Sequence, residues 1–161
     1  MKPSPQVGEE APDFRMPSTQ KDEFHLHAEL EKGPILLYFY LGDFAPNCNA
    51  YMSKLIDIAP EIEKFGFRLK AVNPNPLESH VRWAERMGTD YELIHDRDQE
   101  VSKEYGAIVV NSPLTRGFTN REFFIVGSDR TVKFHWKAHI PREMPELDFI
   151  IEAMQEHQEG E

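Results

Sequence analysis

The chain has 161 residues, and its 40% hydrophobic content, with 11 Phe, 5 Tyr and 2 Trp, is enough for one packed globular domain. A formal net charge of -10 without a cluster of Lys or Arg argues against nucleic acid and anionic membrane surfaces as partners. The first residues lack the apolar core of a signal peptide, and the longest apolar run, residues 35–41, is too short to span a membrane. We therefore expect a soluble, cytoplasmic protein with a single domain over residues 1–161 and a flexible polar tail from about residue 155.

The first predicted element is a central strand over residues 35–41 (ILLYFYL), a continuous apolar run with a glycine-containing turn on each side. A helix is expected directly after it, because Pro46 suits the first helical position. The apolar stripe of this helix recurs at helical spacing, and Pro60 is expected to kink or split it. The stripe consists of Tyr51, Leu55, Ile58, Ile62 and Phe65.

Residues 67–72 and 92–95 are predicted to form two further strands. The helix between them is expected to begin with Asn75 as its cap, followed by a first-turn proline, and to end near Gly88. After the third strand, Asp96 and the glutamine three residues later predict a capped, brief helix.

The C-terminal part of the chain predicts a hairpin over residues 122–126 and 131–136 and then a last helix. The apolar residues of that helix are Leu147, Ile150, Ile151 and Met154. Strands and helices thus alternate before the hairpin and the final helix. This order predicts an α/β, thioredoxin-like fold with a central mixed β-sheet flanked by helices.

Cys48 is the only cysteine, so one chain can form neither an internal disulfide nor a C-x-x-C redox or zinc motif. It falls in the first turn of the helix that follows the central strand. Free backbone N–H groups and the positive end of the helix dipole favour thiolate over thiol there. A buried structural cysteine that acts as a small hydrophobic residue is the alternative interpretation.

Residues 38–48 (YFYLGDFAPNC) resemble the active-site segment of peroxiredoxins, especially the bacterioferritin-comigratory type, in which a strand ending in Phe-Tyr leads into P-x-x-x-T-x-x-C. Residues 8–14 (GEEAPDF) resemble the entry motif of that family. Residues 79–106 resemble its helix, strand and short helix, and residues 121–126 (REFFIV) resemble the strand that its active-site arginine introduces. The resemblance covers most of the chain, from about Gly8 into the final helix.

This resemblance implies a thiol-dependent peroxidase that needs no cofactor and acts on hydrogen peroxide or small organic hydroperoxides. Cys48 would attack the peroxide and become a sulfenic acid, and Arg121 would stabilise the thiolate and the developing negative charge. Arg116 is the second candidate for the guanidinium. The backbone amides of Asn47 and Cys48 would bind the peroxide oxygens. The residues expected to form the substrate site are Tyr40, Leu41, Ala45, Pro46 and Asn47.

Three positions depart from the motif of the family. Leu41 stands in place of the proline, Ala45 in place of the threonine, and Ser53 where many relatives carry a resolving cysteine. A sulfenic acid at Cys48 would therefore be reduced by an outside thiol, either a small molecule, a thioredoxin-like protein or another chain. Loss of the threonine hydrogen bond would cost about 2 to 4 kcal/mol by analogy with oxyanion-hole deletions.

Several alternatives remain open from the sequence. Ala45 and Leu41 favour a redox sensor or binding module with little peroxidase turnover, and a thiol oxidoreductase that acts through mixed disulfides is a third interpretation. A Cys-His hydrolase would need a histidine base against Cys48, and none can be assigned. The histidine pairs at residues 25 and 27 and at residues 135 and 139 lack further ligands, so we expect no metal site. A homodimer is possible.

Overall fold

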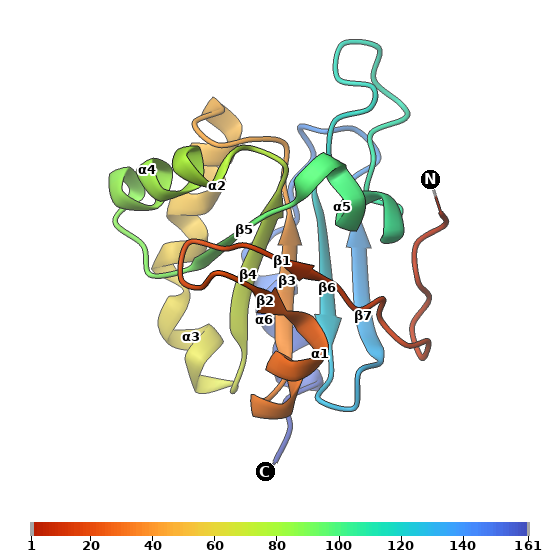
Figure 1. Ribbon diagram of the computed structural model, residues 1–161. Helices are drawn as coiled ribbons and strands as arrows, with labels where there is room; N and C mark the ends of the chain where they lie inside the picture. The colour runs from red at the N-terminus through yellow and green to blue at the C-terminus, as the bar shows by residue number, and fades with distance from the viewer. Residues whose placement is uncertain (1, 161) are drawn as a thin grey trace.

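The computed structural model of the protein describes residues 2–160 and contains a five-stranded mixed sheet in the order β5-β4-β3-β6-β7 (Figure 1). Strands β3, β4 and β5 are parallel, and β6 and β7 are antiparallel to their neighbours. This arrangement confirms the predicted α/β class and the central mixed sheet. The strands are β3 (Ile35–Phe39), β4 (Arg68–Asn73), β5 (Glu92–His95), β6 (Glu122–Val126) and β7 (Val132–Lys137).

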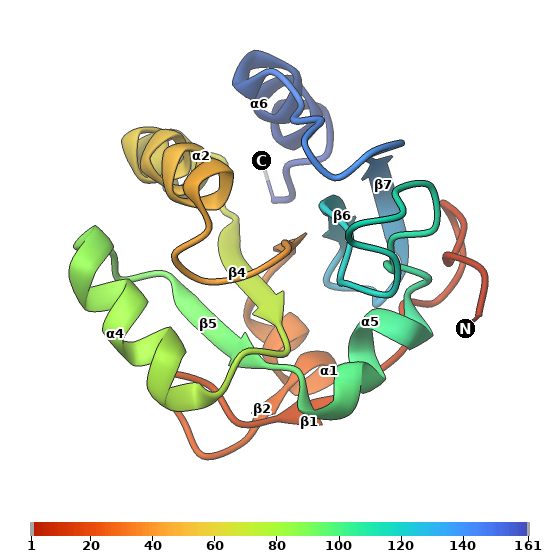
Figure 2. The same ribbon diagram turned by 90° about the horizontal axis from the view of Figure 1, so that it is seen from above.

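The central strand β3 is buried over its whole length, because both faces of the sheet are covered. Its even-numbered residues lie in one apolar cluster with side chains of α2 (Pro46–Asp57), α3 (Ala59–Lys64) and α6 (Leu147–Glu156). Its odd-numbered residues lie in a second cluster on the opposite face. Figure 2 shows α2 and α6 on one side of the sheet and α1 and α5 on the other. The continuous apolar run of β3 follows from this two-sided burial.

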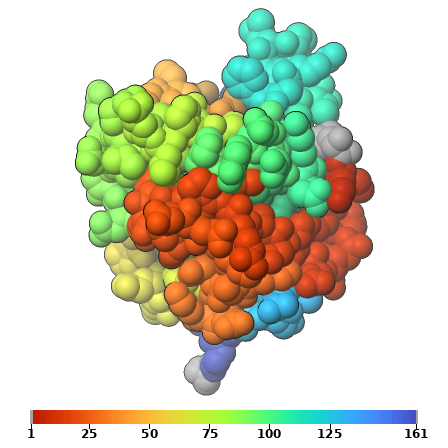
Figure 3. Space-filling view, in the orientation of Figure 1, coloured from red at the N-terminus to blue at the C-terminus, as the bar shows by residue number. Residues whose placement is uncertain are grey.

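The second face is covered in part by the N-terminal segment, which forms the middle of the front of the molecule in Figure 3. The segment contains the short strands β1 (Arg15–Met16) and β2 (Phe24–His25), helix α1 (Leu26–Glu29) and a 3₁₀ turn, η1 (Leu30–Lys32). Another 3₁₀ turn, η2 (Arg97–Gln99), leads into α5 (Glu100–Glu104). The sequence predicted none of the elements before β3, because elements of two to four residues carry no measurable periodicity.

The predicted break at Pro60 is confirmed. Helix α2 ends at Asp57, and α3 starts at Ala59, so that Pro60 lies in the first turn of α3. A proline at that position needs no N–H partner, whereas inside a longer helix it would remove a hydrogen bond and clash with the preceding turn.

Helix α4 (Leu77–Met87) begins one residue later than the sequence predicts, with Pro76 at the N-cap position. The Asn75 side chain does not cap it. Instead, its Oδ1 accepts a hydrogen bond of 2.8 Å from the backbone N–H of Asp43, which follows β3. The helix ends at Gly88, whose φ of 70° is the left-handed conformation that glycine adopts easily. The start of α4 is thereby fixed to the turn after β3.

The brief helix after β5 forms as predicted, but only one of the two predicted capping residues, Asp96, caps it. Both carboxylate oxygens of Asp96 accept hydrogen bonds from backbone N–H groups of α5, at Val101 and Ser102. Gln99 does not complete a capping box, since its side chain donates to Gly117 and Thr119. The Asp96 side chain therefore caps the start of α5, and the Gln99 side chain does not.

Helix α6 continues to Glu156, beyond the expected start of the tail at residue 155. Glu159 accepts hydrogen bonds from the backbone N–H and the hydroxyl of Ser128, in the turn between β6 and β7. Within the tail, Glu159 is thus hydrogen-bonded to the hairpin, and Glu161 lies outside the described residues. Within residues 2–160, no helix has the length and apolar character that crossing a membrane requires.

Candidate active site

Cys48 is the third residue of α2, and its side chain is buried, with only 2% of the residue exposed. The helix begins at Pro46, which has no N–H group, and the N-cap residue Ala45 has no side chain that could cap. Within residues 2–160, the backbone N–H groups of Asn47 and Cys48 have no hydrogen-bond acceptor. These two amides are the orphan donors of the helix terminus, and they lie beside the sulfur.

Arg121 is the residue directly before β6, and its side chain contacts Cys48. Its Nη2 donates to the Cys48 Sγ at 3.9 Å, and its Nη1 donates to the Tyr38 hydroxyl at 2.5 Å. The guanidinium carbon also lies 5.8 Å from the centre of the Tyr51 ring. Only 1% of Arg121 is exposed, so the cation acts on the sulfur with little screening by water. The structure therefore brings together the two residues that the sequence proposed as catalytic.

The electrostatic environment of this pair favours a charged guanidinium and a neutral phenol. Burial lowers the pKa of Arg121, but the Tyr38 oxygen and the Cys48 sulfur outweigh it and raise the pKa above its ordinary value. Burial raises the pKa of the Tyr38 hydroxyl well above its usual range, although Arg121 opposes this shift. The guanidinium therefore holds a positive charge 3.9 Å from the Cys48 sulfur.

Cys48 and Arg121 line one cavity of about 520 Å³ whose walls are mainly apolar. Four of the five residues that the sequence predicted for the substrate site also line it: Leu41, Ala45, Pro46 and Asn47. The remaining walls come from the loop between α5 and β6 and from the segment after β7. These residues are Asn111, Ser112, Pro113, Leu114, Thr115, Ile140, Pro141 and Arg142.

Tyr40 is the exception, and its assignment to the substrate site is corrected. Its ring lies in the core, stacked at 5.2 Å on Trp83 of α4, and its hydroxyl donates to Asp43 at 2.6 Å. Tyr40 faces the same side of the sheet as Tyr38 and Cys48, but its ring is packed between Tyr38 and Trp83 and is not part of the cavity wall. Tyr40 supports the turn that carries Leu41 and Ala45 without lining the cavity.

The family profile with the description AhpC/TSA family matches residues 7–135, which is most of the chain. The chain belongs to the AhpC/TSA family. The resemblance to peroxiredoxins found in the sequence is thereby confirmed. A 1-Cys peroxiredoxin from Medicago truncatula is 27% identical over 159 residues, covering 92% of this chain and 72% of the relative. A peroxiredoxin from Thermoplasma volcanium is 29% identical over 157 residues, covering 92% of this chain and 74% of the relative.

Solved structures of the family share the same fold. A Cys-to-Ser mutant of peroxiredoxin 6 from Arenicola marina superposes with a TM-score of 0.83 at 21% identity, covering 93% of this chain and 72% of the other. Peroxidoxin BcpB from Mycobacterium tuberculosis gives a TM-score of 0.82 at 20% identity, covering 96% of this chain and 99% of the other. These likenesses confirm the predicted thioredoxin-like fold.

Two of the three residues that differ from the family motif line the cavity, and the third lies on the surface of α2. Leu41 and Ala45 are both half-buried and line the cavity, so the motif positions still face the site with different side chains. Ser53, where many members of the family have a second cysteine, is exposed on α2. The free thiol is Cys48, and it is buried.

A buried polar network fixes the turn between β3 and α2, and the sequence analysis did not find it. The Asp43 carboxylate accepts hydrogen bonds from the Tyr40 and Ser79 hydroxyls, and His80 Nδ1 lies 2.7 Å from Asp43 Oδ2. His80 Nε2 lies 3.1 Å from the backbone oxygen of Asn73. Both ring nitrogens of His80 therefore have an oxygen partner. The Asp43 and His80 side chains are buried and lie in contact beneath the turn.

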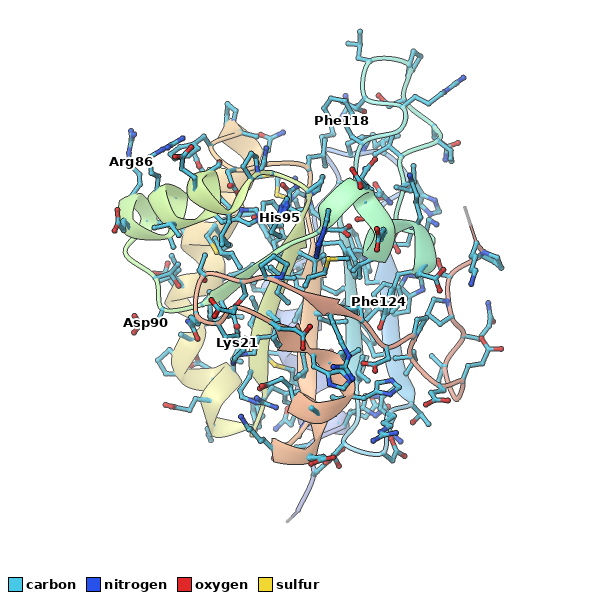
Figure 4. All side chains as sticks on the ribbon, viewed as in Figure 1. Lys21, Arg86, Asp90, His95, Phe118 and Phe124 are labelled. Atoms are coloured by element: carbon cyan, nitrogen blue, oxygen red, sulfur yellow. The ribbon has the colours of Figure 1, made fainter. Side chains whose placement is uncertain are left out.

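The loop between α5 and β6 also escaped the sequence analysis, apart from Arg116. It projects beyond the sheet in Figure 1, and Figure 4 labels Phe118 on it, far from Phe124 in the sheet. Arg116 does not line the cavity, so it is not the guanidinium partner of Cys48. Loop residues have no periodic signal, and only the tertiary structure shows which of them face a site.

The histidines that suggested a metal site are used in separate contacts. His25 Nε2 lies 2.7 Å from Asp13, His27 Nε2 lies 2.8 Å from the backbone oxygen of Ala11, and His135 Nε2 lies 2.8 Å from Glu122. His139 is exposed. Among residues 2–160, no group of three or more His, Cys, Asp or Glu side chains converges as metal ligands would. Among residues 2–160, no histidine hydrogen-bonds to Cys48, whose side-chain partner is Arg121. The described residues therefore do not show the histidine base that a Cys-His hydrolase needs.

Proposed function

We propose that this protein reduces peroxides with Cys48 as the nucleophile. The observation that supports the proposal most directly is the place of the Cys48 sulfur. It lies 3.9 Å from a buried guanidinium and beside two free backbone amides, at a cavity open to a small ligand. A thiolate, a fixed cation and unpaired N–H donors are the groups that attack on an O–O bond requires.

In the reaction, the thiolate sulfur attacks one peroxide oxygen and the O–O bond breaks. The attacked oxygen stays on sulfur as a sulfenic acid, and the second oxygen leaves as hydroxide or alkoxide and takes a proton to give water or alcohol. Sulfur is oxidised and the peroxide is reduced. Arg121 and the amides of Asn47 and Cys48 stabilise the negative charge that moves from sulfur to the leaving oxygen.

The size of the cavity supports hydrogen peroxide and small organic hydroperoxides as substrates. A volume of about 520 Å³ is much larger than hydrogen peroxide needs. Leu41, Pro113 and Ile140 give the cavity apolar walls, which suit the organic part of an alkyl hydroperoxide. Leu41, at the position of the family's proline, lies in the wall beside the buried Cys48.

The reductant is an external thiol, because Cys48 is the only cysteine. One thiol condenses with the sulfenic acid, releasing water and forming a mixed disulfide, and a second thiol attacks that disulfide and restores Cys48. A yeast mitochondrial 1-Cys peroxiredoxin of known structure has a thiol resolving mechanism via glutathione/thioredoxin systems. Either kind of reductant, a small thiol or a thioredoxin-like protein, suits the exposed mouth of this site. Cytoplasmic location and a homodimer stay predictions from the sequence.

The alternative is a redox sensor in which Cys48 is oxidised without rapid turnover. Ala45 favours it, because its methyl group offers no hydrogen bond where a hydroxyl would serve the reaction.

Peroxide consumption with dithiothreitol as the reductant tests the proposal against the alternative. The wild type is expected to consume hydrogen peroxide catalytically, and Cys48→Ser is expected to be inactive. Equal rates for the two proteins would rule out the peroxidase. Stoichiometric oxidation of Cys48 without turnover would support the sensor.

A further inference from the structure

The groups that the proposed reaction assigns to peroxide binding can only donate hydrogen bonds. The Arg121 guanidinium and the backbone N–H groups of Asn47 and Cys48 are donors without a lone pair to offer. A hydroperoxide carries its own O–H group, which needs an acceptor when it is buried. Ala45 supplies none from its side chain. The described catalytic groups therefore leave one substrate hydrogen bond unmade.

Thr115 lies in the wall of the same cavity and has a hydroxyl free to complete this set. Its Oγ1 is buried, and within residues 2–160 it has no hydrogen-bond partner. The backbone of Thr115 is fully used, since its N–H donates to Ser112 at 3.3 Å and its carbonyl accepts from Phe118 at 2.9 Å. The loop thus holds Thr115 in place while its side-chain oxygen is left unpaired.

A second unpaired atom lies in the same wall. Among the buried side-chain nitrogens and oxygens of residues 2–160, only Thr115 Oγ1 and Arg121 Nε lack a partner, and both residues line this cavity. Buried polar atoms are nearly always paired in proteins, and exceptions are expected where a ligand completes them. Both exceptions belong to residues of one cavity, and within residues 2–160 the hydrogen-bonding capacity of each atom is unused there.

We propose that the Thr115 hydroxyl binds the peroxide and supplies the hydrogen bonds that Ala45 cannot make. Its oxygen accepts from the O–H of the hydroperoxide, and its own O–H donates to a peroxide oxygen as negative charge develops there. Thr115 belongs to a loop far from residue 45 in the sequence, so the hydroxyl reaches the substrate from a different wall of the cavity. This assignment rests on the proposed peroxidase function.

The test compares Thr115→Val, which keeps the shape and removes the hydroxyl, with Thr115→Ser, which keeps the hydroxyl. The probes are hydrogen peroxide and tert-butyl hydroperoxide, reacted once with the reduced protein. Thr115→Val is expected to lower the rate constant about 100-fold, as for the loss of an oxyanion-hole donor, and Thr115→Ser is expected to retain most of the rate. Alkylation of Cys48 by iodoacetamide, which does not use the hydroxyl, is expected to be unchanged in both variants.

A rescue experiment makes the assignment specific. Ala45→Thr in the Thr115→Val background is expected to restore most of the lost rate. A Thr115→Val protein that reacts with peroxide at the wild-type rate would overturn the assignment. Equal losses in the peroxide and alkylation rates would overturn it as well, because the change would then have disturbed Cys48 itself.

The rate of the wild-type protein distinguishes a failure of the proposed function from a failure of the Thr115 assignment. A wild type that reacts with peroxide no faster than Cys48→Ser would remove the peroxidase and the role of Thr115 together. A fast wild type with an equally fast Thr115→Val would remove only the role of Thr115.

Discussion

Two sets of buried polar side chains adjoin the turn over residues 41–45, and they differ in how completely they are hydrogen-bonded. In the network beneath the turn, Asp43 accepts from Tyr40, Ser79 and His80, and both nitrogens of His80 have partners. Around the cavity, Arg121 Nε and the Thr115 hydroxyl have none among the described residues. A fully paired network fixes geometry, whereas unpaired atoms at a cavity are available to a ligand. The two sets should therefore respond oppositely to substitution.

The largest effect is expected for Arg121→Gln, which removes the cation beside Cys48. The rate constant for hydrogen peroxide should fall about 100- to 1,000-fold, because an electrostatic stabiliser of the transition state is lost. Stopped-flow measurement of a single turnover checks this. Arg116→Gln is the matched control, since Arg116 lies outside the cavity, and it should react as the wild type does. A wild-type rate in Arg121→Gln would contradict the role of the guanidinium.

His80→Ala tests the paired network and should act mainly on stability. It leaves the buried Asp43 carboxylate without one of its hydrogen-bond partners, which is expected to lower the free energy of unfolding by about 3 kcal/mol. Urea unfolding measures the loss, and His139→Ala, at an exposed histidine, is the control. Combining His80→Ala with Asp43→Ala should cost less than the sum of the single changes. Strict additivity would show that the two side chains do not form a pair.

Tyr38→Phe should have an intermediate effect, because Tyr38 belongs to the core but accepts a hydrogen bond from Arg121. Loss of this acceptor loosens the guanidinium and should slow the peroxide reaction about tenfold, equivalent to about 1.4 kcal/mol. Since burial raises the pKa of Tyr38, its hydroxyl keeps its proton at least up to about pH 10, the ordinary tyrosine pKa. The ratio of wild-type to variant rates should therefore stay constant over the alkaline range. A ratio that changes between neutral pH and that value would indicate ionisation of Tyr38.

The smallest effect on stability is expected for Thr115→Val, in direct contrast to His80→Ala. Its hydroxyl has no partner among the described residues, so removing it should change the free energy of unfolding by less than about 0.5 kcal/mol. Urea unfolding under the same conditions gives the comparison. A loss as large as that of His80→Ala would show that the hydroxyl is bonded within the folded protein and is not available to a ligand.

The parts of the fold that the sequence predicts are those set by local physics. The buried run of β3, the break at Pro60 and the end of α4 at Gly88 all follow from residues close together in the chain. The prediction that Asn75 caps α4 was wrong, because Asn75 instead binds Asp43, which lies 32 residues away in the sequence. Local patterns give the type and place of an element but not the distant group that a polar side chain will meet.

The same distinction applies to the candidate site. Helix position alone marked Cys48, whereas Arg121 was proposed through the family resemblance, and its contact with Tyr38 spans 83 residues. Thr115 gave no signal, because a threonine in an irregular loop resembles any surface residue until its hydroxyl is seen buried and unpaired. Tyr40 was misplaced because adjacency to the motif in sequence does not show that its ring packs against Trp83 in the core and stays out of the cavity wall.

The most direct test of the central claim is to locate the first oxygen that peroxide adds to the protein. Reduced protein is treated with one equivalent of hydrogen peroxide, sulfenic acid is trapped with dimedone, and the modified residue is identified by mass spectrometry. We predict modification of Cys48 before any of the 6 methionines. Oxidation of methionine while Cys48 remains a free thiol would contradict the conclusion that this site is built to react with peroxide.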